Sequence, residues 1–165
     1  MKILVISDIH DRVKALRKAL IDGKVCEAII FCGDTSSPET FSVLIEDGRP
    51  LYAVLGNMEF NEGKIIQLAH QTPHVSFDRD VLKIIIDNKN IVVTHYPDMA
   101  EELAEEGIYD TIFHGHSHLP RNEIINGVLI ANPGEIAGYV SGKLSFGIYD
   151  TKTNLFEILD LNSFK

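Results

Sequence analysis

Five short polar groups follow apolar runs in this sequence, and each contains a side chain that can bind a metal ion. The groups are Asp8-Ile9-His10, Gly33-Asp34, Gly56-Asn57, His95 and Gly115-His116-Ser117-His118. Carboxylate, amide and imidazole ligands without a thiolate suit Mn²⁺, Fe, Co²⁺, Ni²⁺ or Zn²⁺ better than Ca²⁺ or Mg²⁺. The sequence therefore predicts a metal centre assembled from five separate places in the chain.

Each group taken alone has an ordinary structural explanation. An Asp and a His after a strand commonly serve as a helix cap and a surface residue, and Gly-Asp or Gly-Asn pairs are common in turns. The pair His116 and His118 is more demanding, because two imidazoles spaced i, i+2 can face one site only in an irregular or extended loop. Five such groups at the ends of apolar runs favour a metal site over a structural coincidence.

The first half of the chain predicts alternating strands and helices. Continuous apolar runs predict buried strands at 2–7, 28–32 and 51–55. Apolar residues at helical spacing predict helices at 13–20, which Gly23 ends, at 38–45, where Ser37 is the cap, and at 64–70. The carboxyl ends of neighbouring parallel strands meet at one edge of a sheet, so the polar groups that follow them should converge on one crevice.

The second half is richer in strands. We expect strands at 81–86, 91–94 and 111–113, a hairpin at 123–131 around Asn126-Gly127, and a last hairpin formed by 144–149 and 155–161. A capping box from Asp98 to Glu101 predicts a helix that stops near Gly107. Together the two halves predict an α/β fold in which two sheets pack face to face and helices cover their outer faces.

Length and composition restrict the function further. A chain of 165 residues without repeats or a linker is expected to form a single domain, 1–165. Its formal charge of −9 makes binding of duplex nucleic acid unfavourable. The sequence has no apolar run long enough for a membrane span, and its start is too short for a signal peptide, so we expect a cytoplasmic protein.

The two cysteines are not expected to take part in chemistry. Cys26 and Cys32 lie beside or within the apolar run 28–31 and have no neighbouring His or second Cys. A cysteine in such a position is usually a small buried hydrophobe.

The order of the polar groups resembles the calcineurin-like metallophosphoesterase family. Asp-x-His, Gly-Asp, Gly-Asn, His and Gly-His-x-His follow one another as they do in that family, and the resemblance covers nearly the whole chain. The start Met1–His10 and the run Asn132-Pro133-Gly134-Glu135 resemble its small bacterial and archaeal phosphodiesterase branch. The resemblance implies a four-layer α/β/β/α sandwich of two mixed sheets with helices outside, and a centre of two metal ions.

The resemblance also implies which residues hold the ions. The first metal would be bound by Asp8, His10 and His118, the second by Asn57, His95 and His116, and Asp34 would bridge them. Asp34, Asn57 and His95 would form the catalytic set. The family pattern gives His114 no ligand role, and His70 and His74 match no motif and are expected at the surface.

Simple charge counting agrees with such a centre. Asp8 and Asp34 are the only anions in the ligand set, so two divalent cations would leave the site with a charge of about +2. That charge suits a bridging hydroxide and an anionic phosphate ester, and metals about 3.5–4 Å apart stabilise both the attacking and the leaving oxygen. The resemblance implies Mn²⁺ as the usual activating ion, with Ni²⁺, Co²⁺, Fe or Zn²⁺ as alternatives.

Two positions depart from the family pattern. Met58 stands after Asn57 where many family phosphatases have a histidine, and a thioether can neither donate a proton nor stabilise charge as an imidazole does. Tyr96 follows His95 where a glycine is common; its phenol could line the substrate pocket or pack against Pro97. The missing histidine puts efficient hydrolysis of poor leaving groups in doubt.

The expected function is metal-dependent hydrolysis of small phosphodiesters by attack of the metal-bridging hydroxide. One alternative is a phosphomonoesterase, which the absence of a histidine after Asn57 disfavours. Another is a protein-binding scaffold like the retromer subunit that resembles this fold. In that scaffold the histidine set is weakened, whereas it is complete here. The sequence leaves the oligomeric state open, since the apolar closing strands could pair with a second subunit.

Overall fold

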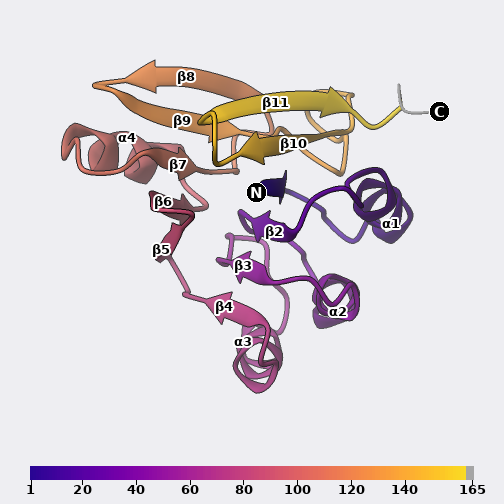
Figure 1. Ribbon diagram of the computed structural model, residues 1–165. Helices are drawn as coiled ribbons and strands as arrows, with labels where there is room; N and C mark the ends of the chain where they lie inside the picture. The colour runs from indigo at the N-terminus through magenta and orange to yellow at the C-terminus, as the bar shows by residue number, and fades with distance from the viewer. Residues whose placement is uncertain (163–165) are drawn as a thin grey trace.

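A computed structural model describes residues 1–162 and contains two β-sheets packed face to face (Figure 1). The six-stranded sheet has the order β11-β10-β1-β2-β3-β4, and the five-stranded sheet has the order β5-β6-β7-β9-β8. In the first sheet the strands are β1 (Lys2–Ile6), β2 (Ala28–Phe31), β3 (Leu51–Ala53), β4 (Val75–Phe77), β10 (Ser145–Asp150) and β11 (Leu155–Asp160). In the second they are β5 (Val81–Ile86), β6 (Lys89–Thr94), β7 (Thr111–Phe113), β8 (Arg121–Ile125) and β9 (Val128–Asn132).

Helices cover the outer faces of both sheets. The helices are α1 (Val13–Asp22), α2 (Pro38–Glu46), α3 (Glu62–Gln71) and α4 (Pro97–Glu105). Figure 1 shows α1 and α2 to the right of the six-stranded sheet, α3 at the bottom below β4, and α4 on the left, against the other sheet. The predicted four-layer α/β/β/α sandwich of two mixed sheets is therefore confirmed.

Alternation along β1 explains how one strand serves two cores. Leu4 and Ile6 pack in the cluster that includes the buried faces of α1 and α2, whereas Ile3 and Val5 pack in the cluster between the sheets. All four side chains are fully buried. Successive side chains of a strand point to opposite faces, so a strand covered on both sides must be apolar throughout. The continuous apolar run that predicted this strand follows from its position between two layers.

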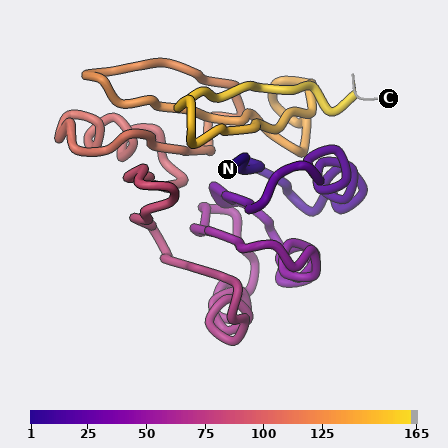
Figure 2. The backbone as a smooth tube through the Cα atoms, in the orientation of Figure 1, coloured from indigo at the N-terminus to yellow at the C-terminus, as the bar shows by residue number. Residues whose placement is uncertain are grey.

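The chain builds most of the first sheet, crosses to the second, and then returns. Figure 2 shows the path, with the late segment β10–β11 lying over the early strands. β10 pairs antiparallel with β1, so that Lys2 lies opposite Asp150 and Val5 lies opposite Gly147. This return fixes the loop 133–144 in front of the end of β1, where the backbone N–H groups of Ile136 and Ala137 donate to Ser7 O and Asp8 O.

One prediction about the start of a helix was wrong, and one short strand was missed. The helix α4 begins at Pro97, with Tyr96 at the N-cap and no side-chain cap, so the capping box expected from Asp98 does not form. Proline at the first helical position needs no N–H partner, and it sets the start of the helix ahead of Asp98. The strand β4 (Val75–Phe77) was not expected at all. It has only three residues, which is too short a run for alternation to be recognised.

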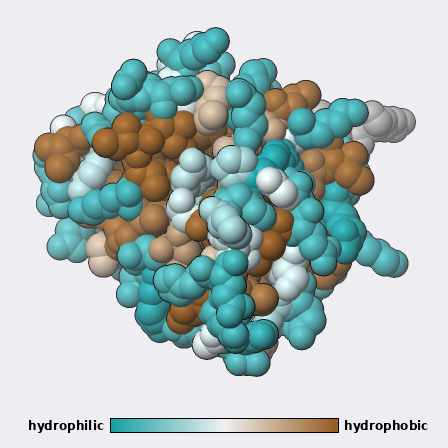
Figure 3. All heavy atoms as spheres, turned by 60° about the horizontal axis from the view of Figure 1, so that its bottom comes forward, coloured by the Kyte–Doolittle hydropathy of each residue, from teal (hydrophilic) through white to brown (hydrophobic). Residues whose placement is uncertain are grey.

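The face of the molecule seen in Figure 3 is mostly hydrophilic with some apolar areas. Figure 3 shows brown side chains gathered on the left, the side on which α4, β5 and β6 lie in Figure 1. Ile85 of the edge strand β5 is 74% exposed. None of the helices within residues 1–162 is long and apolar enough to cross a membrane.

Candidate metal centre

The seven predicted ligands lie in loops that follow parallel strands of both sheets. Asp8 and His10 follow β1, Asp34 follows β2, and Asn57 follows β3; His95 follows β6, and His116 and His118 follow β7. Five of them have positive φ, namely Asp8, His10, Asp34, His116 and His118. Left-handed backbone is uncommon for residues other than glycine, and its clustering here marks a tightly constrained loop assembly.

Two glycines make room for the carboxylates at the centre. A Cβ atom built on Gly56 would overlap the carboxylate of Asp34, and one built on Gly115 would overlap Ser7 Oγ and approach Asp8 Oδ2. The Gly-Asn and Gly-His dipeptides therefore serve a steric purpose, because the backbone must pass directly beside the acidic side chains.

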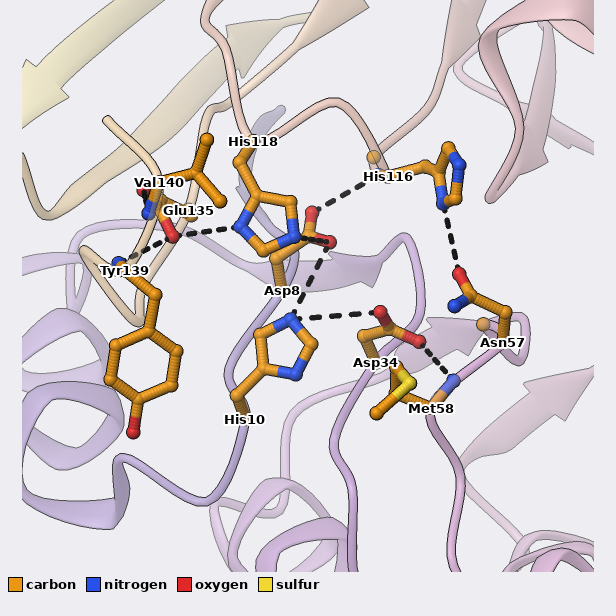
Figure 4. A network of polar contacts seen from close by, with 12 residues as sticks. Asp8, His10, Asp34, Asn57, Met58, His116, His118, Glu135, Tyr139 and Val140 are labelled. Carbon is orange, nitrogen blue, oxygen red and sulfur yellow. Dashed lines mark hydrogen bonds and ion pairs between the residues drawn. The ribbon is translucent and has the colours of Figure 1, made fainter. Parts of the chain in front are cut away.

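Four of the seven residues form one compact group. The ligand atoms of Asp8, His10, Asp34 and His118 all lie within 4.8 Å of one another (Figure 4). His118 Nε2 lies 3.3 Å from Asp8 Oδ1, and His10 Nε2 lies 3.6 Å from Asp34 Oδ2. The rings of His10 and His118 stack with their centroids 5.1 Å apart. Nitrogen and oxygen atoms from three separate loops thus converge on one point, as the ligands of a cation would.

Unpartnered polar atoms in this group fit a metal ion. Asp8 Oδ1 and His10 Nε2 are buried and form no hydrogen bond within residues 1–162. A buried polar atom without a partner is costly, and native proteins seldom leave one unexplained. Both atoms belong to the compact group, so a bound cation would give each of them a partner.

The remaining three residues form a second group next to the first. Asn57 Oδ1 lies 2.9 Å from His116 Nδ1 and 3.1 Å from His95 Nε2. His95 Nε2 also lies 3.6 Å from Asp34 Oδ2, the same oxygen that lies 3.6 Å from His10 Nε2. Asp34 Oδ2 therefore stands between the two groups. The geometry brings all seven predicted side chains together.

Burial sets the charge preferences of the centre. It raises the pKa of Asp8 to about 7 and lowers the pKa of His10 and of His95. Each shift disfavours the charged form of the side chain in a weakly solvated place. A divalent cation would invert this for Asp8, because the ionised carboxylate is then the preferred ligand, while neutral imidazoles are already the form that binds metal.

Two histidines are oriented by hydrogen bonds on the far side of the ring. His95 Nδ1–H donates to Cys32 O at 2.7 Å, which leaves Nε2 facing Asp34 and Asn57. His118 Nδ1–H donates to Glu135 Oε2 at 2.8 Å, which leaves Nε2 facing Asp8. Metal-binding histidines characteristically donate their second N–H in this way.

Glu135 is a partner of the candidate centre that sequence reasoning missed. Its side chain is fully buried, and besides His118 it accepts hydrogen bonds from the backbone N–H groups of Tyr139, Val140 and Ser141. Burial raises the pKa of Glu135, but these hydrogen bonds outweigh it and lower that pKa to about 2. The position after Asn132-Pro133-Gly134 served only as part of the resemblance and gave no signal of a contact with His118.

Glu59 was also missed as a structural partner of the centre. Its Oε1 accepts from the backbone N–H groups of Asp34, Thr35 and Gly56, and its Oε2 accepts from Ser36 N–H and from the Thr35 hydroxyl. One carboxylate thus ties the loop that carries Asp34 to the loop that carries Asn57. No motif around Glu59 in the sequence points to its contact with the 34–36 loop.

The other histidines lie apart from the two groups. His114 is buried, its Nδ1–H donates to Gly115 O at 3.1 Å, and burial lowers its pKa to about 4, so the ring stays neutral. His70 is exposed as expected, and its ring meets Phe77 edge-on. His74 is only half-buried, and its Nε2 lies 3.1 Å from Ile45 O, so it is not a free surface residue.

The rim of the centre is formed by larger, exposed side chains. Met58 is 43% exposed and Tyr96 is 37% exposed, whereas Asp8, Asp34 and His95 are buried. The centroid of the Tyr96 ring lies 5.1 Å from that of His95 and 5.2 Å from that of His116. Of the two positions that the sequence left open for this phenol, the structure therefore shows the one beside the centre. Met58 and Tyr96 therefore mark one exposed side of the centre.

Comparison with known proteins finds a phosphodiesterase sequence, a solved phosphodiesterase structure and a further protein that shares the fold. Phosphodiesterase MJ0936 of Methanocaldococcus jannaschii is 30% identical over 156 residues, which cover 92% of this chain and 94% of that protein. A solved archaeal phosphodiesterase has a TM-score of 0.89 and 28% identity, covering 97% of this chain and 99% of its own. Vps29 of Entamoeba histolytica, solved with Zn²⁺, shares the fold with a TM-score of 0.68 and 17% identity, covering 98% of this chain and all of its own.

The family follows from these comparisons and from the site. Residues 1–154 match the family described as the calcineurin-like phosphoesterase superfamily domain. This match spans every loop that carries one of the seven side chains. The chain belongs to the calcineurin-like phosphoesterase superfamily.

Proposed function

We propose that the protein is a metal-dependent phosphodiesterase that hydrolyses small phosphodiesters. Asp8, His10 and His118 hold one divalent cation, Asn57, His95 and His116 hold a second, and Asp34 bridges them. The observation that carries the proposal is the position of Asp34 Oδ2, 3.6 Å from the imidazole nitrogens of both His10 and His95. Relatives named phosphodiesterase support the reaction type.

Different residues of the protein have different roles in such a centre. Two divalent cations held by these residues would supply hydroxide at neutral pH and would offset the negative charge of the phosphate. Asp34, Asn57 and His95 fix the place where the phosphate is attacked. Cys32 O and Glu135 hold the rings of His95 and His118, so the ligand atoms need not reorganise when substrate binds. Substrate enters over Met58 and Tyr96, which are exposed.

Phosphodiesters fit this centre better than phosphomonoesters. Met58 offers no proton to a leaving alkoxide, and a monoester brings a second negative charge that must also be neutralised. A role as a protein-binding scaffold is not favoured, because the set of histidines is complete. In addition, Asp8 Oδ1 and His10 Nε2 are buried without a hydrogen bond, as expected for atoms that bind a metal ion. The relatives of highest identity named above are enzymes by name.

Further properties belong to the same proposal. Mn²⁺ is the activating ion, and residues 1–165 act as one domain in the cytoplasm, where Cys26 and Cys32 stay reduced. The substrate is a small molecule, because a net charge of −9 repels duplex nucleic acid.

Turnover of two chromogenic esters tests the proposal. Bis-p-nitrophenyl phosphate and p-nitrophenyl phosphate are supplied to protein stripped with a chelator, before and after adding back Mn²⁺, Ni²⁺, Co²⁺, Fe²⁺ or Zn²⁺ singly. We expect no turnover after chelation and recovery with Mn²⁺, with the diester preferred. Turnover that resists chelation, or a preference for the monoester, would contradict the proposal. The Asp34→Asn protein controls for contaminating phosphatase.

A further inference from the structure

A cavity of about 510 Å³ opens beside the residues that directly follow His10. Its apolar lining comes from the first turn of α1, from the residue before β10 and from the segment after β11, namely Val13, Ala15, Leu144 and Leu161. Arg12 and Lys14 line it as well. Its volume lies within the range of small-molecule sites, and its mix of apolar walls and a few charged groups is typical of them.

Two successive side-chain contacts relate the lining of the cavity to the metal centre: Arg12, which lines the cavity, contacts Tyr139, and Tyr139 lies beside His10. The Arg12 guanidinium lies over the Tyr139 ring, 5.4 Å from its centroid, and that centroid lies 6.0 Å from the His10 ring. Figure 4 shows Tyr139 beside His10 on the side away from Asn57. A molecule bound at the first metal would therefore have Tyr139 and Arg12 as its next neighbours in this direction.

Tyr139 is held rigidly in that place. Its backbone N–H donates to Glu135 Oε2, the same oxygen that accepts the hydrogen bond from His118. The next two N–H groups also donate to Glu135, so the base of the tyrosine is fixed relative to a metal ligand. The ring itself is 60% exposed and can contact a bound molecule.

The cations of the cavity have no acidic partner of their own. Neither Arg12 nor Lys14 forms an ion pair with a carboxylate in residues 1–162, and both are exposed. Lys18, deeper along α1, pairs with Asp22 at 2.6 Å. Asp11 also lines the cavity, and its carboxylate keeps its charge while it accepts hydrogen bonds from the hydroxyls of Ser37 and Thr40. One carboxylate against the cations of Arg12 and Lys14 leaves these three groups with a net charge of +1. On a protein of charge −9, two unpaired cations beside an apolar cavity favour an anionic ligand.

We propose that this cavity binds the substituent of the phosphodiester that is not released, and that this substituent carries a second phosphate. The inference rests on the proposed function and specifies its substrate class. Arg12 and Lys14 bind the second phosphate, Tyr139 contacts the group that joins the two phosphates, and the leaving group lies on the opposite side, toward Met58 and Tyr96.

Two substrates that differ by one phosphate test the inference. They are thymidine 5′-(p-nitrophenyl phosphate) and the same compound phosphorylated at the 3′ oxygen. In both, water adds to the 5′ phosphorus and p-nitrophenolate leaves with the electron pair of the broken P–O bond. We expect the 3′-phosphorylated compound to have the higher kcat/KM, by about 10- to 100-fold, the effect of one charge-assisted hydrogen bond.

Substitutions locate the effect. Arg12→Gln and Lys14→Gln should reduce the ratio of the two kcat/KM values toward one, through a rise in KM for the phosphorylated compound. The matched control is Lys24→Gln, an exposed lysine past the opposite end of α1, which should keep the wild-type ratio. A wild-type ratio near one, or a high ratio that survives both cavity substitutions, would overturn the inference.

A binding measurement separates this inference from the proposed function. Calorimetric titration of Mn²⁺-treated protein compares thymidine 3′,5′-bisphosphate with thymidine 5′-monophosphate, and needs no turnover. The cavity is supported as a phosphate-binding site if the bisphosphate binds more tightly than the monophosphate, and if Arg12→Gln reduces this difference while Lys24→Gln does not. This conclusion holds even if the protein hydrolyses none of the esters. Equal affinities would reject the cavity, even if bis-p-nitrophenyl phosphate is hydrolysed.

Discussion

Glu135 Oε2 accepts a hydrogen bond from His118 Nδ1–H at 2.8 Å, inside the protein and away from solvent. The same carboxylate accepts three backbone N–H groups from the segment that carries Tyr139. These hydrogen bonds outweigh the effect of burial and lower the pKa of Glu135 to about 2, so the group is ionised at neutral pH. One buried charge therefore orients a predicted metal ligand and fixes the loop next to it.

The first prediction concerns Glu135→Gln. The variant keeps the size of the side chain but places an amide NH₂ where an oxygen now accepts hydrogen bonds, so one donor group is left facing another. We expect a loss of affinity for the first metal of about 10- to 100-fold, typical for the outer partner of a ligating histidine. The affinity for each of the two metal ions is measured by competition with a chromogenic chelator.

Glu123→Gln is the matched control for that variant. Glu123 is an exposed residue of β8 that pairs with Arg121, so the same chemical change there should leave metal affinity as it is. Equal metal affinity in Glu135→Gln and Glu123→Gln would show that Glu135 serves only the loop and does not act through His118.

The second prediction concerns Asp34→Asn. Asp34 Oδ2 lies between the two groups, and Oδ1 accepts the Met58 N–H at 2.8 Å, a hydrogen bond that an asparagine oxygen can keep. The fold should survive while affinity for both metals falls by more than the roughly 100-fold seen for outer partners. Circular dichroism and metal content measured together check this. A variant that retained two metals and full turnover would exclude Asp34 as the bridge.

Sequence reasoning was most successful where the physical signal is local. The strands β1 and β2 were expected within one or two residues of their bounds, because a strand buried on both faces needs an unbroken apolar run. The predicted start of α4 was wrong, because Pro97 begins the helix one residue before Asp98, which was expected to be the cap. The groups that carry the predicted ligands could be recognised because each is a short motif of neighbouring residues that directly follows an apolar run.

The parts that could not be predicted depend on contacts between distant residues. Glu59 reaches a loop 25 residues earlier in the chain, and Glu135 reaches a histidine 17 residues earlier. Neither separation has a period or a motif that points to its partner. The cavity beside Arg12 likewise requires the end of the chain to pack against α1, which no local pattern reveals.

The third prediction separates His95 from His114. His95→Ala removes a predicted ligand together with the ring that Cys32 O holds, so affinity for the second metal should be lost. His114 is buried and bonded to Gly115 O, outside both groups. His114→Ala should leave a cavity, cost about 1–3 kcal/mol of unfolding free energy, and keep metal content. Urea unfolding and metal analysis distinguish the two variants, and loss of metal in both would mean that the ligand set is misassigned.

The fourth prediction concerns the proton for the leaving group. Met58 follows Asn57 at an exposed side of the centre and has no acidic hydrogen, so the leaving oxygen departs without a proton from this position. Rates for a series of phosphodiesters that differ only in leaving group should therefore fall steeply as the leaving-group pKa rises. Saturating Mn²⁺ keeps metal loading constant across the series.

Met58→His should flatten that dependence only a little. A positioned imidazole contributes on the order of 10²–10⁴-fold where a proton is needed, but Glu59 cannot position this one, because both of its oxygens are occupied by the 34–36 loop and Gly56. We expect a gain below about 10-fold for alkyl esters, a small part of the full effect. A wild-type slope already near flat would point to another donor. His114 is buried away from the substrate side, which leaves Tyr96, and Tyr96→Phe should then steepen the slope.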